Sequence, residues 1–155
     1  MMTIDFKRLG INAGDRILDL GCGEGRHCIN AYILHDKVEV VGVDLSIEDL
    51  MIAQQRFQGF SEPENTEKQL ALFCGNGLSL PFADKSFDKI ICSEVLEHIP
   101  DYQAVLKEIQ RVLKPGGQFA ASVPRYLPEK ICWALSDEYH ANEGGHIRIF
   151  KESEL

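Results

Sequence analysis

Residues 17–27, ILDLGCGEGRH, decide the fold of this chain. The pattern predicts a short apolar strand, then a glycine loop, then the first turn of a helix. Glycines at three alternate positions of the loop permit positive φ angles and remove the β-carbons that would hold a ligand away from the backbone. The N–H groups that open the following helix attract an anionic group. The stretch therefore predicts a loop that cradles a small ligand, although an ordinary strand-to-helix turn has the same pattern.

The spacing of the loop glycines distinguishes between two kinds of ligand. A dinucleotide fingerprint has the spacing G-x-G-x-x-G, whereas here Gly25 comes one residue early and Arg26 stands in the sixth position. Glu24 would also place a negative charge close to a bound pyrophosphate. Both features favour a ligand whose end has an ammonium and a carboxylate. Asp19 and Glu24 would then attract the ammonium, and loop N–H groups would meet the carboxylate.

Length and composition indicate one globular domain over residues 1–155. The chain is 45% hydrophobic and 26% charged, and its formal net charge is −8. Such a charge disfavours nucleic-acid binding through phosphate neutralisation. No apolar run approaches the ~20 residues of a membrane span, and the N-terminus shows no secretory apolar region. We therefore expect a cytoplasmic protein without a membrane span.

The cysteines and histidines give no metal signature. The five cysteines form neither a C-x-x-C pair nor an even-numbered framework, which predicts reduced, mostly buried thiols. The five histidines lack zinc-type spacing. We therefore expect no metal site.

Short β-rich runs alternate with longer amphipathic segments, which is typical of an α/β fold with a mainly parallel sheet. Ser46 and Asp101 are expected helix N-caps, and Pro115-Gly116 is expected to end the last helix before the final strand. A surface loop is expected over Gly59–Lys68. The expected strands are Arg16–Leu20, Val38–Asp44, Gln69–Cys74, Phe87–Ser93 and Gly117–Val123, and the expected helices are Arg26–Leu34, Ser46–Phe57 and Asp101–Leu113.

Polar residues and glycines follow four of these strands. The first strand ends in Asp19 and the glycine loop, the second in Asp44, and the fourth in Ser93-Glu94, while Gly75-Asn76-Gly77 follows the third. Parallel α/β sheets bind ligands at the carboxyl ends of their strands, near the point where strand order reverses. The sequence therefore predicts one site assembled from several strand ends.

Four segments in order resemble the class I S-adenosylmethionine-dependent methyltransferases, in the group that includes the ubiquinone and menaquinone biosynthesis enzymes. They are ILDLGCGEG, VVGVDLS, LPFADKSFDKIICSEVLEHIPD and LKEIQRVLKPGGQFAASVP, within residues 16–124. The resemblance implies a Rossmann-like, doubly wound sheet of mainly parallel strands flanked by helices. It also implies methyl transfer from S-adenosylmethionine to a small-molecule acceptor by in-line displacement, with S-adenosylhomocysteine as product.

The resemblance assigns roles to matching positions. Asp19 would lie near the amino group of the methionine moiety, Asp44 would accept both ribose hydroxyls, and Asn76 with the backbone of the next residues would contact the adenine edge. Leu45 would pack on the adenine face, and Ser93 and Glu94 would face the methyl-donor centre. The complete set of expected cofactor-binding residues is Asp19, Gly21, Cys22, Gly23, Gly25, Asp44, Leu45, Asn76, Gly77, Ser93 and Glu94.

Two residues are candidates for the catalytic step. Glu94 would help to hold the sulfonium region or accept a proton from the acceptor, with a helix-start acid as the alternative interpretation. His146 is a candidate base, together with Tyr139, His140 and Arg148, in the region after the fifth strand. The alternative for each of these is a polar residue in a surface loop.

The chain departs from the resemblance after the fifth strand, because five strands are visible where the family has seven. Residues 125–155 would form part of a substrate or cap region. We expect either a fragment of a longer protein or a sheet completed by self-association through the edge of the fifth strand. A module that binds S-adenosylmethionine without turnover is the main alternative function, and a nicotinamide-dependent oxidoreductase is a weaker one.

Overall fold

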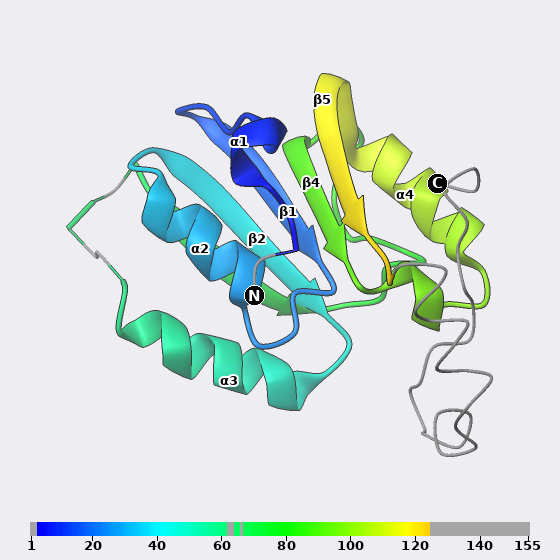
Figure 1. Cartoon of the computed structure of the whole chain (residues 1–155), viewed down its shortest axis with the longest axis horizontal. Coiled ribbons are helices and arrows are strands. Elements are labelled where there is room, and N and C mark those ends of the chain that lie inside the picture. Colours follow the sequence, from blue (N-terminus) through cyan, green and yellow to red (C-terminus); the bar gives the residue numbers. More distant parts are fainter. Residues whose placement is uncertain (1–2, 62–63, 66, 125–155) are drawn as a thin grey trace.

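The computed structural model describes residues 3–61, 64–65 and 67–124. These residues form one sheet of five strands in the order β3-β2-β1-β4-β5, and every neighbouring pair is parallel (Figure 1). Strand order reverses at β1, which lies at the centre of the sheet. The strands are β1 (Asp15–Leu20), β2 (Val38–Asp44), β3 (Gln69–Cys74), β4 (Phe87–Ser93) and β5 (Leu113–Ser122).

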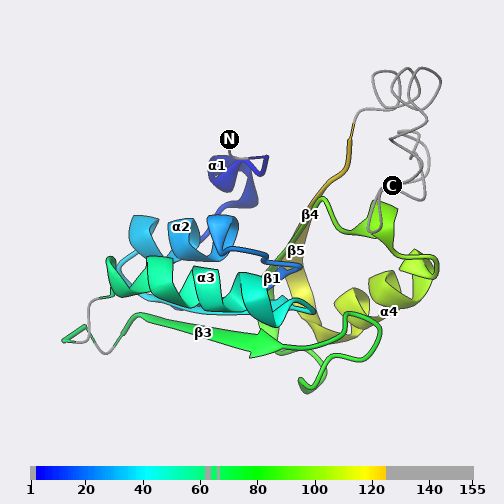
Figure 2. The same cartoon turned by 90° about the horizontal axis from the view of Figure 1, so that it is seen from below.

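Helices cover both faces of the sheet. Figure 2 shows α1, α2 and α3 on one face and α4 on the other. A short 3₁₀ helix, η1, lies between β4 and α4. The bounds are α1 (Phe6–Leu9), α2 (Arg26–Leu34), α3 (Ile47–Gln58), η1 (Leu96–His98) and α4 (Tyr102–Val112). The doubly wound α/β architecture that the sequence predicts is therefore confirmed.

The core consists of two apolar clusters, one on each face of the sheet. Successive strand residues point to opposite faces, so Ile17 joins the cluster beneath α2 while Leu18 joins the cluster beneath α4. α4 contributes a helical stripe of Val105, Ile109 and Val112 to its cluster. Both faces of β1 are thus buried, which holds the loop after this strand at a fixed place.

The expected helix caps are confirmed. The hydroxyl of Ser46 accepts the N–H of Asp49 at 3.1 Å, and the carboxylate of Asp101 accepts the N–H of Ala104 at 3.1 Å. Both caps satisfy N–H groups that have no partner within the first turn of a helix. The helix starts, which set where the neighbouring loops leave the sheet, are therefore encoded locally.

The expectation for Pro115-Gly116 is wrong. α4 ends at Val112 and β5 begins at Leu113, before the Pro-Gly pair. Phe87 pairs with Leu113, but Lys89 pairs with Gln118, so extra residues of β5 bulge out between these two pairs. A bulge tolerates proline because no ladder hydrogen bond needs its missing N–H. Pro115-Gly116 therefore forms a bulge inside the strand and does not separate helix from strand.

The N-terminal helix α1 was not anticipated. Its four residues are too few to give a periodic pattern, but the side chain of Asp5 accepts the N–H groups of Lys7 and Arg8 and starts the turn. α1 lies against β5. The segment before α1 reaches the carboxyl end of β4, where Thr3 Oγ1 lies 2.6 Å from Ser93 Oγ.

No helix in the described part of the chain is long and apolar enough to cross a membrane. β3 and β5 are the two edge strands of the described sheet. Residues 125–155 lie outside the described residues, and with them the candidates Tyr139, His140, His146 and Arg148. Self-association through the edge of β5 stays a prediction.

Candidate functional site

A cavity of about 1010 Å³ lies at the carboxyl ends of the strands, beside the reversal at β1. Its size is at the upper end of the range for small-molecule sites. Ten of the eleven expected cofactor-binding residues line it; only Asp19 does not. The lining residues among them are Gly21, Cys22, Gly23, Gly25, Asp44, Leu45, Asn76, Gly77, Ser93 and Glu94.

The glycine loop is tied to β2 through its own backbone. The N–H groups of Gly21 and Cys22 both donate to the carbonyl of Val43, at 2.7 and 3.1 Å, and the N–H of Gly25 donates to the carbonyl of Cys22 at 2.9 Å. These three N–H groups therefore already donate to backbone carbonyls of the protein. The loop is consequently a preformed wall, and its N–H groups at 21, 22 and 25 do not point to a ligand carboxylate as we expected.

Asp44 connects the glycine loop to the start of α3. Its Oδ2 accepts the N–H of Gly23 at 2.7 Å, and its Oδ1 accepts the N–H of Ser46 at 2.8 Å. A carboxylate has about four acceptor sites, so each oxygen keeps a lone pair after these bonds. The two backbone donors fix the carboxylate at the cavity wall in a position from which it can accept two further hydroxyls.

Asp19 is buried beneath the loop, with 1% of its surface exposed. Its Oδ2 accepts the N–H of Cys28 at 2.9 Å, whereas no hydrogen-bond partner of Oδ1 is found in the described structure. Burial raises the pKa of Asp19 to about 7; the negative charge of Asp44 also raises it, and the Cys28 hydrogen bond opposes the shift. Asp19 therefore connects the end of β1 to α2 and is not among the residues that line the cavity.

The stability of Asp19→Asn relative to wild type is expected to rise between pH 4.5 and pH 8 by on the order of 3 kcal/mol. Because the folded pKa of Asp19 lies above its unfolded value of 3.8, the folded state binds the extra proton between these values. The contribution of Asp19 to stability is present at pH 4 and is lost as pH rises through 7. Urea unfolding of both proteins at pH 4.5 and 8 measures this.

The comparison uses the difference between Asp19→Asn and wild type because His27 titrates in the opposite sense. Burial lowers the pKa of His27 to about 4, so its contribution to stability is lost as pH falls. The asparagine side chain of the variant cannot ionise, and the His27 contribution cancels in the difference. An equal stability difference at pH 4.5 and pH 8 would contradict the assignment.

Glu24, which we expected to attract a ligand ammonium, lines the cavity and has a partner within the protein. Its side chain forms an ion pair with Arg56 of α3, and the guanidinium of Arg56 also donates to the carbonyl of Glu24 at 3.3 Å. Both side chains are about half exposed, so the pair contributes little to stability. The structure therefore gives Glu24 the role of holding the loop to α3.

Glu94 has a strained backbone at the wall of the cavity. Its φ of 58° lies in the left-handed region, which non-glycine residues rarely adopt. Its N–H donates to the carbonyl of Ser122 at 2.8 Å, which anchors the turn to β5. The side chain is exposed. Strain of this kind is found at functional sites, and here it presents a carboxylate to the cavity.

Asn76 organises the loop after β3. Its Oδ1 accepts the N–H of Leu78 at 2.9 Å, and its carbonyl accepts the N–H of Ser79 at 3.0 Å. This is the local turn that asparagine side chains favour. The side-chain NH₂ and the second lone pair of Oδ1 remain for the polar edge of a ligand.

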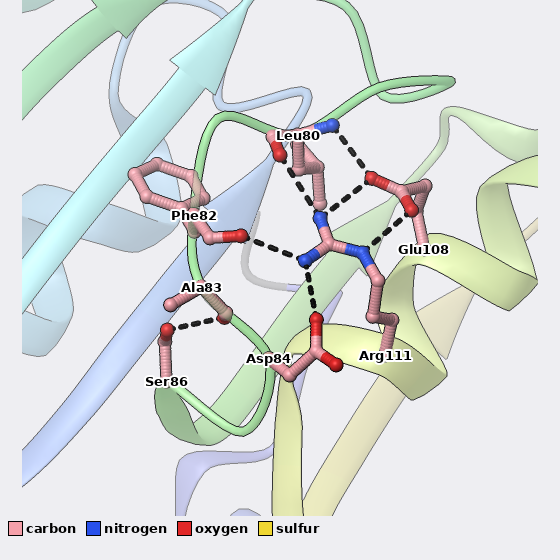
Figure 3. A network of polar contacts seen from close by, with 7 residues as sticks. All are labelled: Leu80, Phe82, Ala83, Asp84, Ser86, Glu108 and Arg111. Carbon is pink, nitrogen blue, oxygen red and sulfur yellow. Dashed lines mark hydrogen bonds and ion pairs between the residues drawn. The ribbon is translucent and has the colours of Figure 1, made fainter.

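An Arg111–Glu108 network holds the connection between β3 and β4 (Figure 3). Arg111 of α4 donates twice to Glu108, and also to the carbonyls of Leu80 and Phe82 at 2.9 and 2.7 Å and to the carboxylate of Asp84 at 2.9 Å. Glu108 in turn accepts the N–H of Leu80 at 2.7 Å. Hydrogen bonds from Arg111 lower the pKa of Glu108 to about 2. The connection contains no helix, so this planar fork fixes the loop that carries Asn76 and Gly77.

Arg111→Met is expected to lower the free energy of unfolding by about 2–3 kcal/mol, since it leaves two loop carbonyls without their side-chain donor and removes two of the hydrogen bonds to Glu108. Lys37→Met is the matched control, because the Lys37–Glu67 pair is more than half exposed and should cost less than about 1 kcal/mol. Urea unfolding measures both variants. Equal effects of the two substitutions would show that the network does not fix the loop.

Sequence reasoning missed His27, which lines the cavity and is buried with 4% of its surface exposed. Its position directly after the glycine loop was the available signal, because the first turn of the helix after such a loop lies beside the ligand. Burial, and then the charge of Arg26, lower the pKa of His27 to about 4, so the imidazole is neutral near pH 7.

The cysteines of the described residues form no disulfide. Cys22, Cys28, Cys74 and Cys92 are free thiols, and all but Cys74 are buried. Among residues 3–61, 64–65 and 67–124 there is no cluster of three or more His, Cys, Asp or Glu side chains that could hold a metal ion.

Comparison with known proteins gives a consistent result. Residues 11–153 match the model of a family described as "Methyltransferase domain". The demethylmenaquinone methyltransferase of Lactobacillus johnsonii is 39% identical over 114 residues, which are 73% of this chain and 45% of the relative. Sterol 24-C-methyltransferase ERG6 of Saccharomyces cerevisiae is 31% identical over 148 residues, which are 96% of this chain and 35% of the relative. The chain thus spans less than half of the length of these relatives.

A solved structure extends the similarity to three dimensions. The YcgJ protein of Bacillus subtilis superposes with a TM-score of 0.75 at 28% sequence identity, over 96% of this chain and 61% of that protein. The match covers nearly the whole chain, including the five described strands.

Proposed function

Because this chain belongs to the methyltransferase domain family, as a class I S-adenosylmethionine-dependent member of the ubiquinone/menaquinone-like group, we propose that it binds S-adenosylmethionine and methylates an apolar small molecule. The observation that carries the proposal is the cavity lined by the glycine loop, Asp44, the Asn76 turn and the Ser93-Glu94 strand end. These groups come from four separate strand ends, and each suits a different part of the cofactor.

The residues present fit this cofactor. Gly23 lies on the cavity wall, and a β-carbon built there would meet no atom within 4 Å, so the loop leaves open space beside its backbone. The fixed Asp44 carboxylate suits vicinal hydroxyls, and Leu45, which is 67% exposed, suits the face of an adenine ring. Asp44, Leu45, Asn76 and Gly77 would hold the nucleoside, and the glycine loop would hold the methionine end.

When bound, S-adenosylmethionine supplies a methyl group on a positively charged sulfur, ready for displacement by a nucleophile. The chain's own task is mainly alignment of that nucleophile, which accounts for large accelerations in such reactions. Glu94 would hold the positive region electrostatically or accept a proton from an acceptor hydroxyl or carbon acid. The strained backbone of Glu94 supports this role because it presents the carboxylate to the cavity.

An apolar acceptor is supported by the part of the cavity next to Glu94. The segment that follows Glu94 contributes Val95, His98, Ile99 and Pro100 to the lining, and all of these but His98 are apolar. The names of the two relatives, a demethylmenaquinone and a sterol methyltransferase, also describe apolar acceptors. Binding without turnover is the alternative function, and a nicotinamide-dependent oxidoreductase is disfavoured by the early Gly25.

Calorimetry on the purified chain with S-adenosylmethionine, S-adenosylhomocysteine and NAD tests the binding step. We expect both sulfur ligands to bind and NAD to fail. NAD binding without binding of the sulfur ligands would refute the proposal. Transfer of a labelled methyl group to quinol, sterol and phenol acceptors then distinguishes turnover from binding alone. Glu94→Gln is the matched variant, with expected loss of transfer. Unchanged affinity for S-adenosylmethionine in this variant would assign Glu94 to proton transfer, and weakened affinity would assign it to holding the positive region.

A further inference from the structure

A chain of hydrogen bonds runs along one wall of the cavity and includes the N-terminal segment. Ser122 Oγ lies 2.7 Å from Ser93 Oγ, Ser93 Oγ lies 2.6 Å from Thr3 Oγ1, and Thr3 Oγ1 lies 3.1 Å from His27 Nε2. The four side chains come from β5, β4, the segment before α1, and α2. Segments that are far apart in the sequence are thus joined by hydroxyl groups and one imidazole.

Only two of the four hydrogen-bonded side chains face the proposed cofactor. Ser93 and His27 line the large cavity. Thr3 instead lines a second cavity of about 480 Å³ between α1 and β5. Thr3 therefore stands in the wall between the two cavities, and it can influence a ligand in the large cavity only through Ser93 and His27.

The imidazole of His27 determines which way the hydroxyl groups point. His27 is neutral, so one of its ring nitrogens carries no hydrogen. When that nitrogen is Nε2, it must accept from Thr3, and Thr3 must then accept from Ser93. The single hydroxyl hydrogen of Ser93 is consumed, so Ser93 turns only a lone pair toward the cavity. When Nε2 carries the hydrogen, it donates to Thr3, Thr3 can donate to Ser93, and the hydroxyl hydrogen of Ser93 is then free to point at the ligand or at Ser122.

A positively charged ligand selects between these two arrangements. A cation beside Ser93 is stabilised by a lone pair and repelled by a hydroxyl hydrogen, whereas an uncharged thioether makes little distinction. The neutral state of His27 also adds no positive charge to this wall. A ligand shifts an equilibrium only by its difference in affinity for the two states, and here that difference is the charge on sulfur.

We propose that Thr3 is a positioning residue that couples Ser93 to Nε2 of His27, so that a cationic ligand holds Ser93 as a hydrogen-bond acceptor toward the cavity and S-adenosylmethionine is favoured over its uncharged product, S-adenosylhomocysteine. The inference rests on the proposed function and adds a determinant outside the cavity lining. This preference also favours product release. When the methyl group is transferred, the sulfur loses its positive charge, and the interaction between Ser93 and the sulfur is weakened.

Thr3→Val tests this role, because valine keeps the shape of threonine and removes the hydroxyl. Thr3→Ser keeps the hydroxyl and is the matched control. Calorimetry gives the dissociation constants of S-adenosylmethionine and S-adenosylhomocysteine for each protein. We expect Thr3→Val to reduce the preference for S-adenosylmethionine by about threefold to tenfold, the worth of one hydrogen bond, and Thr3→Ser to retain it.

The ratio of the two constants separates this role from a structural one. A substitution that merely loosens the N-terminal segment weakens the binding of both ligands equally and leaves the ratio of their dissociation constants unchanged. An unchanged ratio in Thr3→Val would therefore overturn the role of Thr3. Failure of the wild-type chain to bind either ligand would instead overturn the proposed function. Imidazole ¹⁵N shifts of His27 give a ligand-free readout: we expect a change of tautomer population in Thr3→Val, and identical shifts would contradict the hydrogen-bond chain.

Discussion

Gly21→Ala is expected to lower the free energy of unfolding by about 3–5 kcal/mol, the largest effect of any single substitution considered for this chain. Gly21 has a φ of 72°, where side chains are strained. A β-carbon there would also overlap the side chain of Val95, which lies in the turn after β4. Neither β1 nor the Val95 turn can yield without disturbing the buried centre of the sheet. Urea or thermal unfolding measures the loss.

Gly23→Ala is the matched control for Gly21→Ala. Gly23 also has a positive φ, of 50°, but an added β-carbon would meet no atom of the described structure within 4 Å. We expect a stability loss of about 1 kcal/mol from backbone strain, together with weakened cofactor binding because the methyl group enters the cavity. Equal losses of stability in the two variants would refute the distinction between a glycine that faces protein and one that faces ligand.

Asp44→Ala is expected to weaken binding of S-adenosylmethionine by about 2–4 kcal/mol, which is roughly 30-fold to 1000-fold in the dissociation constant. The substitution removes the proposed acceptor of two hydroxyls. It also leaves the N–H groups of Gly23 and Ser46 without the carboxylate that fixes the loop to α3. Calorimetry with the cofactor measures the effect.

Ser46→Ala is the control for Asp44→Ala. It removes the N-cap bond to Asp49 at the same helix start but leaves the Asp44 carboxylate in place. We expect a stability loss of about 1 kcal/mol and little change in affinity. An unchanged dissociation constant in Asp44→Ala would remove this residue from the site, and equal losses in both variants would assign the effect to the helix start.

The sequence predicted the elements of the fold well, because their signals are local. The alternation of strands and helices, the caps at Ser46 and Asp101, and the bounds of β2, β3 and β4 depend on neighbours in the chain. β5 was placed wrongly at its start because Pro115 and Gly116 are strong turn residues, and only pairing with β4 allows them to form a bulge. α1 was missed because four residues give no periodicity.

For the site, the sequence identified the residues that line the cavity, but not the hydrogen bonds and ion pairs that they form within the protein. Glycines, carboxylates and strand ends at family-like spacing pointed to residues that do line one cavity, because parallel strands that alternate with helices must bring their carboxyl ends to one edge of the sheet. Asp19 was expected at the ligand, yet it lies below the loop. Glu24 was expected to meet an ammonium, and in the structure it pairs with Arg56 of α3.

The sequence by itself thus determined the order of the elements, the family, and the residues from which a cofactor site is made, since propensity, capping and spacing act over a few residues. The tertiary structure alone decided which groups remain available to a ligand. It commits the N–H groups of Gly21 and Cys22 to β2, buries Asp19, and brings Thr3 between His27 and Ser93. Those outcomes depend on hydrogen bonds and desolvation between segments that are distant in the chain, and a linear pattern carries no record of such contacts.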